Sequence, residues 1–255
     1  MSIYAYCLVR LSSDEVLPTL RGIAARPVFP LRCDRYAMLL SRLERNFRFS
    51  ARSIVEHGQV IRRVFETHTV LPVRFGTFFR SERQITELIR ENRQDLLESF
   101  CRLRGKAEMH LKLLLDFPGN GSDLRKPPQC SRASNGFSSA GNGAHLDPQC
   151  QDVAEQISTR WRELFRPLDQ QVTCRRLATG QLLVDCAHLI ESQQLGSYQK
   201  ACCLASEGVQ DSELRMSGPW PPYHFLPATV RLPAPKVVPI RSRSRSAARM
   251  AAAAR

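Results

Sequence analysis

Residues 118–149 limit most strictly what this chain can fold into. This segment reads PGNGSDLRKPPQCSRASNGFSSAGNGAHLDPQ, and 17 of its 32 residues are Gly, Pro, Ser or Asn. Such a segment buries too little apolar surface to offset the entropy that ordering would cost. It therefore predicts a flexible linker between a domain at 1–117 and a domain at 150–232, followed by a disordered basic tail at 233–255.

The composition on either side of this linker is that of a globular protein. The chain has 255 residues, of which 43% are hydrophobic and 24% are charged, and this balance predicts a buried core. No apolar run approaches the roughly 20 residues of a membrane-spanning helix, and the first residues contain no basic leader. We expect a soluble, cytoplasmic protein without membrane insertion.

The positive charge is concentrated at the C-terminus. The last 15 residues, RSRSRSAARMAAAAR, carry five arginines and no acidic residue, which leaves +8 of the formal charge of +13 for the rest of the chain. A tail of this kind can attract RNA, anionic lipid or acidic protein by charge alone. The folded part lacks the aromatic stripe of an RNA-binding strand. A basic-tailed RNA-associated protein is therefore an alternative interpretation, without a specific nucleic-acid partner.

Hydrophobic periodicity predicts an α+β fold for residues 1–117. The run IYAYCLV is apolar on both faces, as in a central strand, and EMHLKLLL alternates, which places Glu108, His110 and Lys112 on its polar face. Pro72 cannot donate to a strand ladder and so belongs on a sheet edge. The order predicts a ferredoxin-like antiparallel sheet with helices on one face. The expected strands are 3–9, 35–43, 69–79 and 108–115, and the expected helices are 51–67 and 81–104.

Residues 150–232 predict a second small α+β domain. Val153, Ile157, Trp161 and Leu164 recur at helical spacing. They are followed by a hairpin at 171–190 that turns near Thr179 and Gly180, a weaker helix at 192–206 and a strand at 212–216.

Known catalytic motifs are absent from the sequence. It has no Gly-rich phosphate loop, no GxSxG elbow, no HExxH and no CxxC pair, and we predict no cofactor, no small-molecule substrate and no catalytic residue. An enzyme with an unrecognised site is a second alternative, which would require a polar pocket where two or more of Glu56, His57, His68 and Glu108 converge.

The nine cysteines predict reduced thiols rather than a disulfide framework. The cluster closest to a metal site is Cys174, Cys186, His188 and Cys202/Cys203, whose spacing matches no known zinc site. We therefore predict no metal.

The segment SGPWPPYHF, residues 217–225, is the most unusual in composition. Gly218 and Pro219 are expected to stop the ladder of the preceding strand, and the next two prolines hold the chain extended. This stiffened backbone projects Trp220, Tyr223 and Phe225 either onto the protein's own sheet or toward a partner. We favour the first, because large aromatic residues near strand ends are more often packed than displayed.

Three segments together resemble the gas vesicle protein GvpL/GvpF family. They are HTVLPVRFGTFF at 68–79, LRGKAEMHLKLLL at 103–115 and SGPWPPYHF at 217–225, and their order is also similar. The pair Glu56 and His57 fits the Glu-His pair that the family carries ahead of the first segment. The linker, the Arg-Ser tail and LLVDCAHLIE at 182–191 depart from the family's pattern.

The resemblance implies a non-enzymatic accessory or minor structural protein of gas vesicle assembly. Its implied partners are the hydrophobic shell protein and other accessory proteins, held in a chaperone-like, ATP-independent way, and its implied location is the gas vesicle, with the cytoplasm before assembly. The candidate motif or partner-binding residues are Pro72, Arg74, Phe75, Gly76, Phe78, Phe79, Gly105, Glu108, Gly218, Pro219, Trp220, Pro221, Pro222, Tyr223 and Phe225.

Two roles remain open for the first of these segments. In the first role, the strand at 69–75 offers an edge to which an extended partner segment adds, beside the three phenylalanines. In the second, Arg74 pairs with a buried carbonyl or carboxylate, and Gly76 lets the chain turn into the next element. We favour the structural role for Arg74 and Gly76, and leave the phenylalanines divided between core and partner contact.

Overall fold

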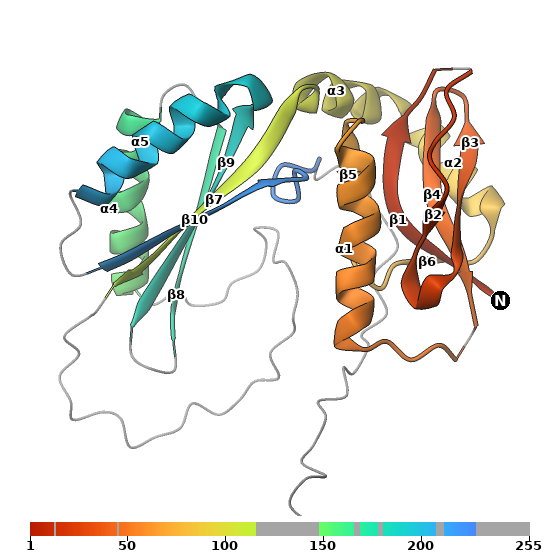
Figure 1. Cartoon of the computed structure of the whole chain (residues 1–255), viewed down its shortest axis with the longest axis horizontal. Coiled ribbons are helices and arrows are strands. Elements are labelled where there is room, and N and C mark those ends of the chain that lie inside the picture. Colours follow the sequence, from red (N-terminus) through yellow and green to blue (C-terminus); the bar gives the residue numbers. More distant parts are fainter. Residues whose placement is uncertain are drawn as a thin grey trace, which may run out of the picture. The chain divides into compact units, whose positions relative to one another are not determined.

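The computed structural model divides into two compact units, Met1–Arg104 and Gly105–Ala228 (Figure 1). It describes residues 1–12, 14–44, 46–115, 148–165, 169–177, 181–207 and 212–227. Almost all of the linker predicted at 118–149, the turn near Thr179 and Gly180, and the tail at 233–255 lie outside the described residues. Both units are α+β, as the sequence predicts.

The first unit is built on one antiparallel sheet. Its strands follow the order β2-β3-β4-β1-β5, and β6 also pairs with β1. This order is compatible with the predicted ferredoxin-like topology. The connection from β1 to β3 runs through β2 and the short 3-10 helix Ile23–Ala25, and the ferredoxin-like detail stays a prediction. The strand bounds are β1 Ser2–Arg10, β2 Leu20–Arg21, β3 Pro27–Cys33, β4 Tyr36–Leu43, β5 Val70–Pro72 and β6 Phe78–Phe79.

Helices cover both faces of this sheet, which corrects the expectation that they lie on one face. Tyr36 of β4 stacks on Phe100 of α3 (Arg93–Leu103), with ring centroids 5.5 Å apart. Ser41, five residues along the same strand, bonds Tyr6, whose ring stacks on His57 of α1 (Ala51–Phe65). Because successive side chains of a strand point to opposite faces, α1 and α3 lie on different sides. Helices are needed on both sides because β1 and β4 are apolar and buried on both of their faces.

The helix boundaries differ from the predicted ones at two places. The predicted helix 81–104 is two helices, α2 (Glu82–Glu91) and α3, separated at Asn92, whose backbone leaves the helical region. Ser81 caps α2, since the N–H of Gln84 donates to Ser81 Oγ at 3.2 Å. α1 begins at Ala51, as predicted, after Ser50, whose N–H donates to Ser53 Oγ, and it ends at Phe65, two residues before the predicted end.

The second unit is a four-stranded antiparallel sheet with helices on one face. The strand order is β10-β7-β9-β8, and Figure 1 shows α4 and α5 on the same side of these strands. Met109, Leu111 and Leu113 of β7 pack there against Trp161 and Phe165. The bounds are β7 Lys106–Leu115, α4 Pro148–Leu164, β8 Asp169–Arg176, β9 Leu182–Glu191, a 3-10 turn Ser192–Gln194, α5 Leu195–Glu207 and β10 Ser212–Trp220.

The boundary between the units lies before β7, and the predicted boundary at residue 117 is wrong by one strand. The strand predicted at 108–115 is present, but it pairs with β9 along its whole length and with β10 on its other side. Its apolar face fits the helices of the second unit. The first unit therefore ends at Arg104, and the second begins at Gly105 rather than at 150.

His57 holds the first sheet together as a neutral side chain. It is 4% exposed, its Nδ1 accepts a bond from the Tyr4 hydroxyl at 2.8 Å, and its Nε2 donates to the Val73 carbonyl at 3.1 Å. Burial lowers the pKa of His57 to about 4, although the Val73 bond opposes this effect. The protonated form is therefore excluded from the folded state near neutral pH.

We expect His57 to make the first unit sensitive to acid. Its folded pKa lies below its ordinary value near 6.5, so the unfolded chain takes up this proton first as pH falls. The contribution of neutral His57 to the free energy of unfolding is fully present above pH 6.5. As the pH falls from 6.5 to 4, the first unit loses this contribution, which is on the order of 3 kcal/mol. Urea unfolding at several pH values, compared with His57→Gln, measures it. Since His188 of the second unit titrates equally in both proteins, the difference isolates His57, and identical pH profiles would contradict the assignment.

None of the described helices combines the length and hydropathy that crossing a membrane requires.

Candidate functional site

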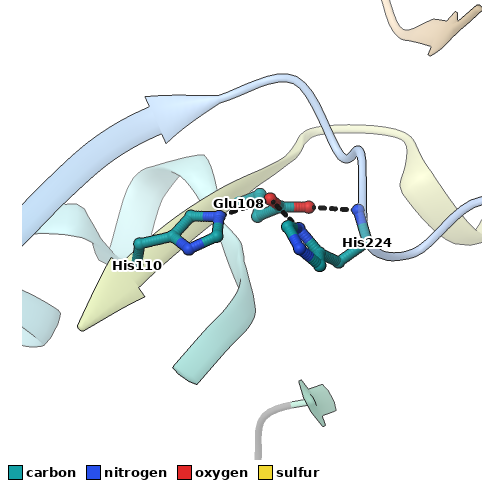
Figure 2. A group of neighbouring side chains, drawn as sticks. All are labelled: Glu108, His110 and His224. Carbon is teal, nitrogen blue, oxygen red and sulfur yellow. Dashed lines mark hydrogen bonds and ion pairs between the residues drawn. The ribbon is translucent and has the colours of Figure 1, made fainter. Parts of the chain in front are cut away.

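A buried carboxylate, Glu108, lies on the polar face of β7 (Figure 2). Its Oε1 accepts hydrogen bonds from His110 Nε2 and from His224 Nδ1, both at 2.7 Å. Its Oε2 accepts the backbone N–H of His224 at 2.8 Å. Three donors thus converge on one carboxylate that is almost wholly removed from solvent, and two of them come from a residue 116 positions along the chain.

His110 joins Glu108 to a second carboxylate. Because His110 lies two residues after Glu108 on the same strand, both side chains point to the same face. The other ring nitrogen of His110, Nδ1, donates to Asp185 Oδ1 of β9 at 2.8 Å. Lys112 Nζ lies 3.4 Å from the second oxygen of Asp185. The cluster is therefore a chain of alternating charges across two neighbouring strands.

The protonation of this network follows from its contacts. Burial by itself would lower the pKa of His110, but the bonds to Asp185 and Glu108 outweigh it and raise this pKa to about 9. Burial would raise the pKa of Glu108, and the bonds from His110 and His224 reverse the direction and lower it. The same balance, with His110 and Lys112 as partners, lowers the pKa of Asp185. At neutral pH an imidazolium therefore lies between two carboxylates.

The segment after β10 brings His224 to this network. Pro221, Pro222 and Phe225 are buried, and the N–H of Tyr223 closes a tight turn on the Pro221 carbonyl at 2.8 Å. The carbonyl of His224 accepts a bond from Gln171 Nε2 of β8 at 2.7 Å. The chain is thus fastened to both β7 and β8, across the face of the sheet that lacks the helices.

The predicted end of the last strand is wrong, because β10 continues to Trp220. Gly218 and Pro219 do not stop the ladder; the register shifts between Ser217 and Trp220, and pairing resumes at Trp220 with Glu108. Gly218 makes this bulge possible, since its φ of +132° is a conformation that side chains rarely adopt. The predicted packing of the aromatics holds for Phe225, which is 3% exposed, while Tyr223 is half-buried. Trp220 remains 36% exposed.

The candidate residues of 68–79 lie in the first unit. Pro72 is on β5, at the end of the strand order, as predicted, but all of β5 is buried. Phe79 is buried, and the half-buried Phe75 and Phe78 pack against Phe49, with ring centroids 4.9 and 5.9 Å away. These phenylalanines therefore belong mainly to the core.

The turn predicted at Gly76 is present, whereas the ion pair or hydrogen bond predicted for the Arg74 side chain is not found among the described residues. Gly76 has φ +86°, and its N–H donates to the Tyr4 hydroxyl at 3.3 Å. Arg74 is exposed, and within the part of the chain that the structure describes its guanidinium makes no ion pair, so the predicted pairing with a buried group is wrong. It contributes instead through its backbone carbonyl, which accepts the Thr77 hydroxyl at 2.7 Å. Gly105, with φ +71°, directly precedes β7, and its carbonyl accepts the N–H of Ser192.

Within the first unit, the residues that an enzymatic interpretation requires do not converge on a common polar pocket. Glu56 bonds Arg52 and the N–H of Ala24, and His68 bonds Glu15 and Thr67. His57 is enclosed by Tyr4 and Val73, and Glu108 belongs to the other unit.

Most of the Cys/His cluster considered from the sequence lies in or against the second core, while Cys203 is exposed. His188 bonds the Tyr198 hydroxyl at 2.7 Å and Gln170 Oε1 at 3.1 Å, and Cys186 Sγ lies 3.1 Å from its Nε2. Burial lowers the pKa of His188 to about 4. Both ring nitrogens are occupied by uncharged partners, which is the environment of a neutral core histidine.

Sequence reasoning selected Glu108 but missed His110, Asp185 and His224. The alternation of EMHLKLLL already placed His110 beside Glu108 on the polar face, so this part of the site had a signal. No pattern connected that strand with His224 or with Asp185, which are brought in only by the pairing of β7 with β10 and β9.

Comparison with known proteins gives a family match over most of the chain. The family model described as "Gas vesicle synthesis protein GvpL/GvpF" matches residues 2–227. Gas vesicle protein F of Streptomyces sp. (strain CB03234) is 24% identical over 244 residues, covering 89% of this chain and 100% of that relative. Gas vesicle protein F1 of Halobacterium salinarum is 22% identical over 173 residues, covering 67% of each chain.

Two crystal structures share the fold. GvpF from Microcystis aeruginosa superposes with a TM-score of 0.64 at 22% identity, covering 89% of this chain and 99% of that one. GvpF from Anabaena sp. PCC7120 gives a TM-score of 0.65 at 19% identity, covering 89% and 98%.

Proposed function

The chain belongs to the GvpL/GvpF family of gas vesicle synthesis proteins, and on that premise we propose that it is an assembly factor that holds the hydrophobic shell protein before incorporation. Its role is related to gas vesicles, and the family is not an enzyme class. A shell protein that lines a gas space exposes a strongly apolar surface until it is assembled, and such surfaces aggregate. A protein that covers them stoichiometrically needs no nucleotide.

The observation that carries this proposal is the exposed edge strand β10. It is nine residues long and lies at the end of the strand order of its sheet. Met216 is 41% exposed and Trp220 is 36% exposed, so apolar side chains are displayed along this strand. An edge strand with exposed apolar side chains can accept an extended segment from another chain. The proposed occupant is an extended apolar segment of the shell protein.

The edge first considered from the sequence, β5, supports the proposal less well. It has only three residues, and all of them are buried. The phenylalanines beside it pack on Phe49 and Tyr4. We therefore assign shell-protein binding to the second unit, and the other accessory proteins remain proposed partners of the protein as a whole.

We expect Met216→Lys to weaken capture of the shell protein by about 10-fold or more, because a charge on the edge strand opposes pairing with an apolar segment. The measurement is binding of purified shell protein to the immobilised full chain, together with suppression of shell-protein aggregation by light scattering. Trp220→Ala is also expected to weaken capture, because it removes the second exposed apolar side chain of this strand.

The matched control is Leu204→Lys, which places the same charge at an exposed leucine of α5. It is expected to bind as the unchanged protein does. If Met216→Lys and Leu204→Lys both leave capture intact, β10 is not the binding strand. If the unchanged protein neither captures the shell protein nor prevents its aggregation, the proposed function is wrong.

A further inference from the structure

Glu108, His110 and His224 present three metal-ligating atoms to one point. One carboxylate oxygen and one nitrogen from each histidine all lie within 4.8 Å of one another, and Figure 2 shows the two rings on either side of the carboxylate. Glu108 and His110 come from the same strand, while His224 is held in place by its own backbone bonds to Glu108 and Gln171. The positions of all three are therefore fixed by the sheet.

The chemistry of this donor set suits zinc. Two imidazole nitrogens and one carboxylate oxygen are a ligand set that zinc accepts, with a fourth position left for water or an added ligand. The side chain of Glu108 is almost wholly buried, but those of His110 and His224 are 13% and 25% exposed. Solvent therefore reaches the side of the cluster where a fourth ligand would bind.

The surroundings of His110 resemble the second shell of a metal site. A metal-binding histidine almost always donates its other ring nitrogen to a carboxylate or carbonyl, which fixes its tautomer and orientation. His110 donates Nδ1–H to Asp185, and Asp185 is itself positioned by Lys112. The nitrogen directed at Glu108 is therefore Nε2, the one needed for coordination.

A bound divalent ion would also balance the negative charges of the cluster. In the metal-free network, His110 and His224 each donate an N–H to the same oxygen of Glu108. A divalent ion would take the place of these two protons and would neutralise the two carboxylates, Glu108 and Asp185. Ligands of tetrahedral zinc at 2.0–2.1 Å lie about 3.3 Å apart, so the present contacts of 2.7 Å need to open by roughly half an ångström.

We propose that Glu108, His110 and His224 bind one zinc ion, which fastens the SGPWPPYHF segment to the centre of the second sheet. The site is independent of shell-protein binding. It would stabilise the unit that contains β10 by binding only its folded state.

Calorimetric titration of the metal-free full chain with zinc chloride tests this proposal. The protein is prepared without a histidine tag and with Cys101→Ser and Cys203→Ser, because both thiols are exposed and bind zinc themselves. We expect one zinc ion per chain and a higher melting temperature in its presence. Cobalt in place of zinc is expected to give a visible spectrum without a thiolate charge-transfer band.

Three variants identify the ligands. His224→Asn keeps a donor for Glu108 but removes the zinc ligand, and it is expected to abolish both binding and the rise in melting temperature. Asp185→Asn is expected to weaken binding by about 10- to 100-fold, as for other outer-shell partners. The control is His68→Asn, which removes a histidine that also bonds a carboxylate, Glu15, but lies in the other unit. It should leave binding unchanged.

Two outcomes would overturn the proposal. If the unchanged protein takes up no zinc while its circular dichroism shows a folded chain, the cluster is an ionic network only. If His224→Asn binds zinc as tightly as the unchanged protein, or if the cobalt spectrum shows thiolate ligation, the metal is held elsewhere.

Discussion

Glu108→Ala is expected to lower the free energy of unfolding of the second unit by about 3–5 kcal/mol, as when one partner of a buried ion pair is removed. The carboxylate is 1% exposed and accepts three hydrogen bonds, two of them from side chains and one from the backbone of His224. Its removal leaves the N–H of His224 and the Nε2–H of His110 without an acceptor. It also removes the main link between β7 and the segment after β10.

Urea unfolding followed by tryptophan fluorescence measures this loss, because both tryptophans, Trp161 and Trp220, belong to the second unit. Chelator in the buffer excludes any contribution from bound metal. The matched control is Glu191→Ala at the end of the neighbouring strand β9. Glu191 is half-exposed and lies 3.6 Å from Lys106, an ion pair worth roughly 0–1 kcal/mol. Equal losses for the two variants would show that the buried network does not stabilise the unit.

Local sequence patterns predicted most elements of this fold, and the errors come from contacts between distant segments. The alternation in EMHLKLLL gave the correct strand and the correct faces, because the period of two depends only on the strand itself. It could not indicate which sheet the strand joins. The chain leaves α3 directly for β7, and its partners, β9 and β10, follow about 70 and 100 residues later.

Two strands of the first sheet, β2 and β3, were not predicted, and β3 was missed for a local reason. β3, PVFPLRC, contains Pro27 and Pro30, which argue against a strand because proline cannot donate to a ladder. β3 nevertheless pairs with β4 in register from Phe29 to Cys33. Pro30 is tolerated because it lies beyond the two residues that the other neighbour, β2, covers, which are Pro27 and Val28. Pro27 is the first residue of the strand, a position where proline occurs. Tertiary pairing overrides local propensity here.

The difference between local patterns and contacts of distant segments also explains which residues of the candidate site were predicted. The sequence identified SGPWPPYHF as a stiff aromatic corner, and buried Pro221, Pro222 and Phe225 agree with that interpretation. It did not identify His224 as the residue that joins this corner to β7, since its partner, Glu108, lies 116 residues earlier. Buried Pro221, Pro222 and Phe225 fix the course of the backbone, and this backbone positions His224 beside Glu108.

Gly218 is the position in this corner where substitution is expected to cost most. A Cβ on Gly218 would lie 2.6 Å from Met109 Sδ and 2.9 Å from the carbonyl oxygen of Glu108. The sulfur can move, but the carbonyl belongs to the central strand β7, which pairs on both sides. The φ of +132° adds backbone strain for any residue with a side chain. Gly218→Ala is therefore expected to destabilise the second unit by about 3 kcal/mol, from strain and overpacking together.

Gly196→Ala separates this effect from the general consequence of replacing glycine. Gly196 lies in α5 of the same unit, and a Cβ there meets nothing within 4 Å. Alanine is the better helix former by about 0.5–1 kcal/mol, so this variant is expected to be more stable than the unchanged protein. Urea unfolding of both variants should give shifts of opposite sign. A stable Gly218→Ala protein would mean that β10 pairs with β7 without the close approach of Gly218 to Glu108. The position of His224 in the candidate site would then be wrong as well.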